Sequence, residues 1–183
     1  MRKLQVEEYF NLLSELGSVS FFHYLSEEEK KQLLGVCEIL SYDKDERIVK
    51  QGEIGTCLYA VLSGTLSVTI VDMCGKEIFL STIKKGEFFG EAGIFYNLQR
   101  TANVFPATDT AGILRIERKA LFEFIQKRPS AGVKILILFI RGLLDKLSES
   151  NKELAGLRGG SVLSQNQIDR LIDEIMERIK TAG

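Results

Sequence analysis

Between Cys37 and Glu117 the chain consists of short β-prone segments separated by turn residues, a pattern that strongly limits the possible folds. Residues 65–70, TLSVTI, alternate strictly, which places Leu66, Val68 and Ile70 on one face of a strand. Glycines occupy the joints, where positive φ or tight turns are expected: Gly52, Gly55, Gly64, Gly75 and Gly86. The expected strands are EILSYD, ERIVKQ, CLYAVLSG, TLSVTIVD, EIFLSTI, TANVFPA and AGILRIE. Many short strands at regular spacing predict an antiparallel sandwich or jelly-roll barrel.

Helical periodicity flanks this β-rich region. Residues 6–16 gather apolar side chains on one side of a helix, and Ser26 with Glu29 forms a capping-box pattern before a second helix. After Glu117, KALFEFIQKRP predicts a short helix that ends before Pro129, and residues 130–157 predict a long one. The sequence therefore predicts an α+β fold: an antiparallel jelly-roll barrel with flanking N-terminal helices, a short helix near residue 91 and a long C-terminal helix.

The long helix carries apolar side chains at heptad spacing. Its two heptad positions are Ile140, Leu147 and Leu154, and then Leu143, Ser150 and Leu157. A stripe this narrow favours a homodimer through the long helix, whereas the fully apolar first half also fits packing on the chain's own barrel. Gly159 and Gly160 end this helix. We expect three parts: an N-terminal helix at 1–17, a domain at 18–158 that includes the long helix, and a linker with an amphipathic tail helix at 159–183.

Composition excludes several classes of function. The formal net charge is −1 and the pI is near 6.0, whereas proteins that coat nucleic acid or membrane surfaces need a positive excess. Three cysteines without a C-x-x-C pair indicate reduced thiols in the cytoplasm. A single histidine excludes a His-rich metal site, and no G-x-S-x-G, Walker A or G-x-G-x-x-G pattern occurs. Residues 135–140 are too few to span a bilayer. We expect a cytoplasmic, non-enzymatic protein without a cofactor.

The segment FFGEAGIFYNLQRTANV, residues 88–104, places one acid and one base around a short apolar stretch. Gly90 permits close approach of the backbone to a ligand, and residues 91–96 are long enough for about one and a half helical turns. A helix N-terminus suits a phosphate, and the guanidinium of Arg100 can hold phosphate oxygens in a bidentate manner. The same residues also fit an acidic first helical turn followed by a surface arginine.

In this context the chain resembles the cyclic nucleotide-binding domain family from about Phe21 to Leu154. The resemblance rests on FFHYLSEEEKKQL, on ERIVKQGEIGTCLYAVLSGTLSV and on GEFFGE…QRTANV, residues 86–104, which we call the cassette. It implies that Glu91 accepts the ribose 2′-hydroxyl of a cyclic nucleotide and that Arg100 pairs with the cyclic phosphate. The implied ligand-binding set is Gly90, Glu91, Ala92, Gly93, Arg100, Thr101 and Ala102.

The chain departs from the family pattern at several positions. Gln99 stands where the family usually has Pro, and Ala92 and Gly93 stand where it usually has Leu and Ala. Asp45 replaces a turn glycine, which predicts a left-handed aspartate or a rearranged turn. None of these changes removes a charged contact.

The residue after the arginine bears on the choice of ligand. A threonine at this position, Thr101 here, resembles the sequence of cyclic GMP-responsive kinases and channels, but Ser or Thr also occurs at this position in cyclic AMP receptors. Cyclic AMP is the expected ligand, with cyclic GMP as the alternative.

The resemblance also implies an output, in which phosphate capture draws the cassette inward and lets the C-terminal helices close over the base. Residues 159–183 are too few for a helix-turn-helix module and carry few Lys or Arg, so DNA binding is not expected. LSQNQIDRLI, residues 163–172, resembles the peptide of the flagellar motor switch protein that captures phosphorylated response regulators. The anchors that this implies for a receiver-domain partner are Leu163, Ile168, Leu171 and Ile172. An amphipathic helix packed within the protein fits the same pattern.

Two functions therefore stand at this point. The first is a cyclic nucleotide receptor that changes its helix arrangement on binding and signals to a partner. The second is an interaction scaffold with a degenerate barrel, whose tail recruits a receiver-domain response regulator. A barrel enzyme of the cupin kind would need several His or carboxylate metal ligands, and one histidine makes that class remote.

Overall fold

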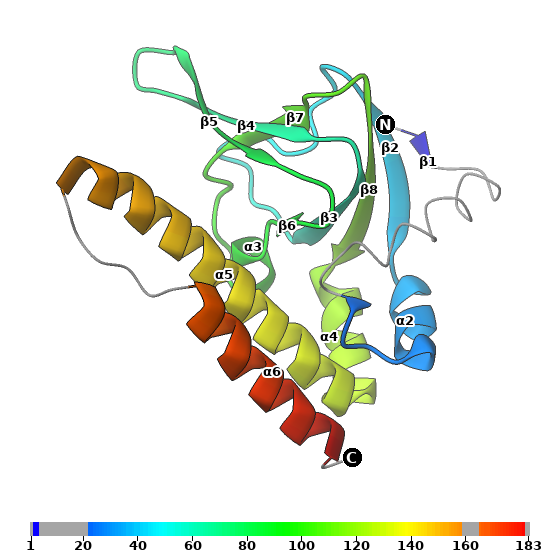
Figure 1. Ribbon diagram of the computed structural model, residues 1–183. Helices are drawn as coiled ribbons and strands as arrows, with labels where there is room; N and C mark the ends of the chain where they lie inside the picture. Colours follow the sequence, from blue (N-terminus) through cyan, green and yellow to red (C-terminus); the bar gives the residue numbers. More distant parts are fainter. Residues whose placement is uncertain (1, 4–21, 159–164, 182–183) are drawn as a thin grey trace. The chain divides into compact units, whose positions relative to one another are not determined.

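The computed structural model describes residues 2–3, 22–158 and 165–181 (Figure 1). The chain divides into two compact units, Met1–Phe124 and Ile125–Gly183. The strands are β1 Arg2–Lys3, β2 Glu38–Asp43, β3 Cys57–Ser63, β4 Leu66–Val71, β5 Glu77–Ile83, β6 Phe88–Phe89, β7 Asn103–Pro106 and β8 Thr110–Glu117. The helices are α2 Glu27–Leu34, α3 Ala92–Phe95, α4 Arg118–Lys127, α5 Pro129–Arg158 and α6 Gln165–Thr181. The boundary between the units falls inside α4.

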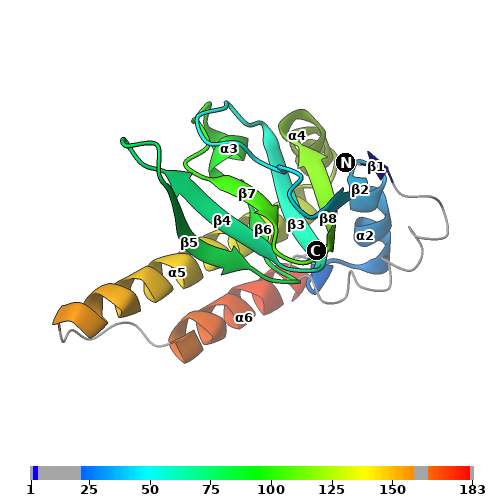
Figure 2. The ribbon, with the colours of Figure 1, turned by 90° about the horizontal axis from the view of Figure 1, so that it is seen from above.

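The strands of the first unit form two antiparallel sheets, which Figure 2 shows from above. One sheet has the order β1-β2-β8-β3-β6 and the other has the order β5-β4-β7. The core draws on both sheets, because Leu40, Val61 and Ile113 cluster with Leu66 and Val104. Burial of apolar surface between two sheet faces is the main term that stabilises such a unit.

The predicted fold class is confirmed, and two of its details change. In the described part of the chain the strands form two sheets and not one closed barrel. The predicted strand ERIVKQ is wrong, since the structure retains only an isolated bridge between Val49 and Val104 there. The reason lies at Gln51, whose backbone N–H donates to the side chain of Asn103 in β7 at 2.9 Å and not to a backbone carbonyl of that strand. Asp45 has a φ of 71°, which confirms the predicted left-handed turn.

The helices largely follow the sequence pattern. α2 begins with the predicted capping box, in which Glu29 N–H donates to Ser26 Oγ at 3.2 Å and Ser26 N–H donates to Glu29 Oε2 at 2.7 Å. The helix predicted over residues 6–16 and the Gly-Gly linker lie outside the described residues. Of the helices that the structure describes, none combines the length and the apolar character needed to cross a membrane.

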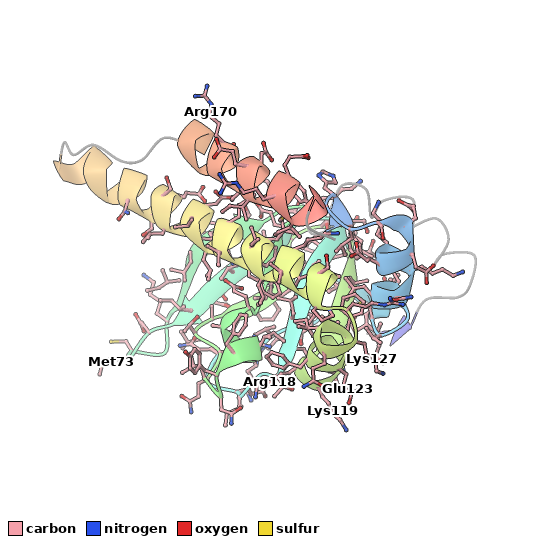
Figure 3. The ribbon with its side chains drawn as sticks, turned by 90° about the horizontal axis from the view of Figure 1, so that it is seen from below. Met73, Arg118, Lys119, Glu123, Lys127 and Arg170 are labelled. Carbon is pink, nitrogen blue, oxygen red and sulfur yellow. The ribbon has the colours of Figure 1, made fainter. Side chains whose placement is uncertain are left out.

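The second unit contains two long helices that lie side by side (Figures 1 and 2). Ile172 and Met176 are buried on α6, while Arg170 points away from α5 (Figure 3). Arg141 of α5 donates to Asp169 of α6 at 2.5 Å, so a charge-assisted bond joins the two helices.

Candidate functional site

The backbone of Arg100 is held by the loop that precedes β3. Gly52 N–H donates to the Arg100 carbonyl, and Arg100 N–H donates to the Glu53 carbonyl, both at 2.8 Å. An isolated bridge between Ile54 and Gln99 extends this pairing by one step. Because the Arg100 backbone both donates and accepts a hydrogen bond, its position is fixed, and this fixes the place from which the side chain extends.

The guanidinium of Arg100 lies against backbone carbonyls of the first unit. Its Nη1 donates to the Gly90 carbonyl at 3.1 Å, and its Nη2 donates to the Cys57 carbonyl at 2.7 Å. The guanidinium carbon lies 5.7 Å from the centre of the Tyr59 ring, which stacks on Phe89 at 5.0 Å. Burial raises the pKa of the Tyr59 phenol to about 12, so the ring stays neutral at physiological pH and offers its face to the cation.

Three glycines make room for this side chain. A Cβ atom on Gly55 would overlap with Nε of Arg100, and one on Gly90 would lie 2.7 Å from its Nη1. A Cβ atom on Gly93 would overlap with the Gly55 carbonyl and lie 2.9 Å from the same Nη1. Gly90 also has a φ of 84°, whereas Gly55 does not have a positive φ. Gly93 therefore does not leave open space where the family usually has Ala, because the Arg100 side chain and the Gly55 loop occupy that space.

The charge of Arg100 is not matched by an anion within the described residues, where its guanidinium bonds only to carbonyl oxygens. Those bonds use two of the five N–H groups that a guanidinium has, so donors are available for an added ligand. A half-buried cation that lacks a counter-ion favours an anion such as a phosphate. Within the same described residues no cluster of His, Cys, Asp and Glu side chains could hold a metal ion.

The other predicted residues take different places around this arginine. Glu91 is buried, with 8% of its surface exposed, and it precedes α3 as the N-cap with helical backbone angles. Ala92 and Thr101 are exposed, and Ala102 is half-buried. The structure thus brings Gly90, Gly93 and Arg100 together, with Glu91 adjacent to Gly90 in the chain.

The predicted partner-binding residues belong to the tail, in the second unit. Ile172 is buried in the second unit. Leu163 and the side chains of Ile168 and Leu171 lie outside the described residues.

Arg118, the first residue of α4, makes contacts that the sequence analysis missed. Its Nη1 donates to Asn97 Oδ1 at 2.7 Å, and its Nη2 donates to the carbonyls of Tyr96, at 3.0 Å, and of Gly93. Figure 3 labels this side chain beside α3. A basic residue at a helix start is unfavourable for the helix dipole, and that placement is the sequence signal that could have singled it out.

Residues 39–128 match the family model described as the cyclic nucleotide-binding domain. This part of the chain is a cyclic nucleotide-binding domain. The matched segment includes the whole cassette, the loop that holds Arg100 and all of α4. Domains of this family are regulatory, and the match covers no catalytic domain.

The relatives of this cyclic nucleotide-binding domain include a transcription regulator and a kinase. The cAMP-activated global transcriptional regulator CRP of Pasteurella multocida is 29% identical over 124 residues, which are 68% of this chain and 57% of that protein. A cGMP-dependent protein kinase of Plasmodium berghei is 32% identical over 121 residues, which are 66% of this chain and 13% of the kinase. The chain thus spans about half the length of the CRP relatives and a small part of the kinases.

Solved structures share the fold. A cyclic nucleotide-binding domain from Methylobacillus flagellatus aligns with a TM-score of 0.71 at 21% identity and covers 86% of this chain and 88% of that chain. The catabolite activator protein of Thermus thermophilus aligns with a TM-score of 0.62 at 24% identity and covers 88% and 85%. At these identities the likeness concerns the fold alone.

Proposed function

We propose that this chain is a receptor for a cyclic nucleotide, which it binds through Arg100 and Glu91, and that it passes the signal on by rearranging its C-terminal helices. The observation that supports the proposal most is the pairing of the Arg100 guanidinium with carbonyls alone. A cyclic phosphate has one negative charge, which would compensate this cation, and the free N–H groups of the guanidinium would donate to its oxygens.

Glu91 completes the proposed ligand contact. A buried carboxylate beside the N-terminus of α3 can accept a hydrogen bond from a ribose hydroxyl, which an inorganic phosphate could not offer. The proposed contact set also includes the backbone of Gly90, Ala92 and Gly93, with Thr101 and Ala102 after the arginine. Thr101 is exposed, so its hydroxyl is accessible to a base that lies over the sugar. We propose cyclic AMP as the ligand and cyclic GMP as the alternative.

A thermal-shift comparison tests this function directly. We expect cyclic AMP or cyclic GMP, at about one hundred times its dissociation constant, to stabilise the chain by about 2.7 kcal/mol. For a chain of this size that amounts to roughly 5–10 °C in melting temperature. The linear 5′-monophosphates are the control, because they carry the same base and sugar without the ring phosphate. Equal shifts with linear and cyclic nucleotides, or no shift with either, would contradict the proposal.

A homodimer through α5 is the second part of the proposal. Ile140, Leu143 and Leu147 lie on the heptad stripe and are 56%, 47% and 58% exposed in the single chain. Apolar side chains at this spacing on one helix suit the seam of a two-stranded coiled coil. The stripe therefore supports association of two copies through α5.

The tail supports the alternative function, recruitment of a receiver-domain response regulator by α6. The proposal rests on the sequence of residues 163–172, and α6 begins inside that stretch. Because Ile172 is buried and Asp169 bonds to Arg141, binding of a partner through this face requires α6 to leave α5. A tail that must be released in this way could couple partner binding to the arrangement of the C-terminal helices.

The dimer and the tail are tested by two separate measurements. Light scattering of the full chain is expected to give the mass of two copies, and a monomer mass would contradict the dimer.

In a pull-down with a phosphorylated receiver domain, the full chain is expected to capture the partner, whereas a chain that ends at Arg158 is expected not to capture it. Equal capture by both chains would contradict the role of the tail, and circular dichroism checks that the shortened chain is folded.

A further inference from the structure

We propose that Arg118 is a positioning residue that couples the cassette to the C-terminal helices. The inference rests on the proposed function, because it assigns the route by which ligand capture would reach α5. It concerns a residue that is not a member of the proposed ligand-binding set, and whose guanidinium bonds the cassette from the side of α4.

The three acceptors of Arg118 lie at the end of the cassette helix. Two of them, the carbonyls of Gly93 and Tyr96, are backbone groups of α3 and its C-cap, and the third is the Asn97 side chain just beyond it. The last carbonyls of a helix lack intrahelical partners and favour a cation. A helix of one turn cannot hold its own conformation in water, so these bonds contribute much of what fixes α3.

Arg100 and Arg118 bond the backbone on the two sides of α3. Arg100 bonds the Gly90 carbonyl before α3, and Arg118 bonds the Gly93 carbonyl inside it. Arg118 N–H also donates to the Thr56 carbonyl at 2.8 Å, next to Gly55, which lies against Arg100. A change in the position of the Arg100 side chain on phosphate binding would therefore act on residues that Arg118 contacts directly.

The other end of α4 continues the route. The chain passes from the first unit to the second between Phe124 and Ile125, inside this helix. Ile125 then meets α5 closely, since a Cβ atom on Gly132 would lie 2.6 Å from Ile125 Cγ2. A helix that is bonded to the cassette at its first residue and packed on α5 at its end can transmit a displacement between them.

The experiment compares the full chain with Arg118→Ala, Arg118→Lys and Lys119→Ala. Lys119→Ala is the matched control, because it removes a positive charge from the same helical turn. The Lys119 side chain is 88% exposed. Amide hydrogen exchange is measured without ligand for residues 93–97 and for residues 125–135. Calorimetry with cyclic AMP and cyclic GMP, and exchange with each ligand bound, complete the set.

Arg118→Ala is expected to speed exchange roughly tenfold or more in both segments without ligand, because charged hydrogen bonds are lost at one end of the route. It is also expected to keep nucleotide affinity within about tenfold while abolishing the ligand-induced change in exchange at residues 125–135. Arg118→Lys is expected to restore part of that response, and Lys119→Ala to behave as the unaltered chain. A residue with only a local structural role would not separate binding from response in this way.

Two results would overturn the inference: faster exchange confined to residues 93–97, or an unaltered ligand response in Arg118→Ala. If the unaltered chain bound neither cyclic nucleotide in the calorimeter, the proposed function would fail. The exchange measurements without ligand would then still decide whether Arg118 links the cassette to residues 125–135. Failure of the proposed function and failure of the coupling are thus distinguishable.

Discussion

Replacing Arg100 with alanine is expected to weaken cyclic nucleotide binding at least about a hundredfold. The estimate follows from a loss of about 3 kcal/mol when one partner of a buried charged contact is removed, at 1.4 kcal/mol for each factor of ten. The variant should also melt earlier without ligand, because the Cys57 and Gly90 carbonyls lose their donors. Each such group left unpaired costs about 1–3 kcal/mol if water does not replace the donor.

Isothermal titration calorimetry measures the affinity, and Arg47→Ala provides the matched control. Arg47 is an exposed arginine of the same unit whose guanidinium lies 5.2 Å from the Phe105 ring, so its removal takes away the same charge and a similar aromatic contact. Arg47→Ala is expected to leave the affinity within about twofold, as is usual for surface substitutions. Binding that is equally strong in Arg100→Ala would remove the basis of the proposed phosphate contact.

Local patterns predicted the strands well where the backbone bonds stayed within the sheet. The segments EILSYD and EIFLSTI coincide with β2 and β5. The segment ERIVKQ has similar composition but does not form a strand. Its Gln51 amide bonds to the Asn103 side chain, and its Ile48 and Val49 amides share the Val104 carbonyl, so both acceptors lie about 50 residues further along the chain. A sequence pattern contains no information on such distant acceptors, so this error was unavoidable at that level.

For the site, the family resemblance singles out the charged groups, and the structure supplies their surroundings. On residue types alone, Glu91 and Arg100 also fit an acidic first helical turn followed by a surface arginine, and their ligand roles follow from the resemblance of the cassette to the cyclic nucleotide-binding domain family. The acceptors of Arg100 are backbone carbonyls, and every residue has one, so composition could not indicate them. For Arg118 the basic residue at the start of α4 was a usable signal, but its acceptors could not be predicted for the same reason, since two of the three are carbonyls as well.

Gly55 lies at a joint between strands, as the sequence predicts, but the reason for a glycine there differs from the predicted one. The sequence placed it among turn glycines, where positive φ is expected, and the four other glycines of that group do have positive φ. Gly55 does not, and its side-chain position is instead filled by Arg100. The need for glycine here arises from a side chain 45 positions away in the sequence and not from the local turn.

The Gly55→Ala substitution is therefore expected to act through Arg100. The backbone of Gly55 can accept an L residue, but the new methyl group would displace the guanidinium from the Cys57 and Gly90 carbonyls. We expect a loss of about 1–3 kcal/mol in the free energy of unfolding, measured by urea denaturation, and weaker nucleotide binding.

In a chain that already contains Arg100→Ala, the same Gly55→Ala change should cost nothing or stabilise the chain by about 0.4–1 kcal/mol. The clash is then absent, and alanine restricts the unfolded chain more than glycine does. The double-mutant cycle thus predicts that the cost of Gly55→Ala disappears or changes sign without Arg100, which a purely local effect of the turn cannot produce. Gly52→Ala is the control: nothing lies near its Cβ position, but its φ is 84°, so its cost should be the same with or without Arg100. If Gly55→Ala destabilises both backgrounds equally, the space at Gly55 does not serve the arginine, and the glycines around Arg100 need another explanation.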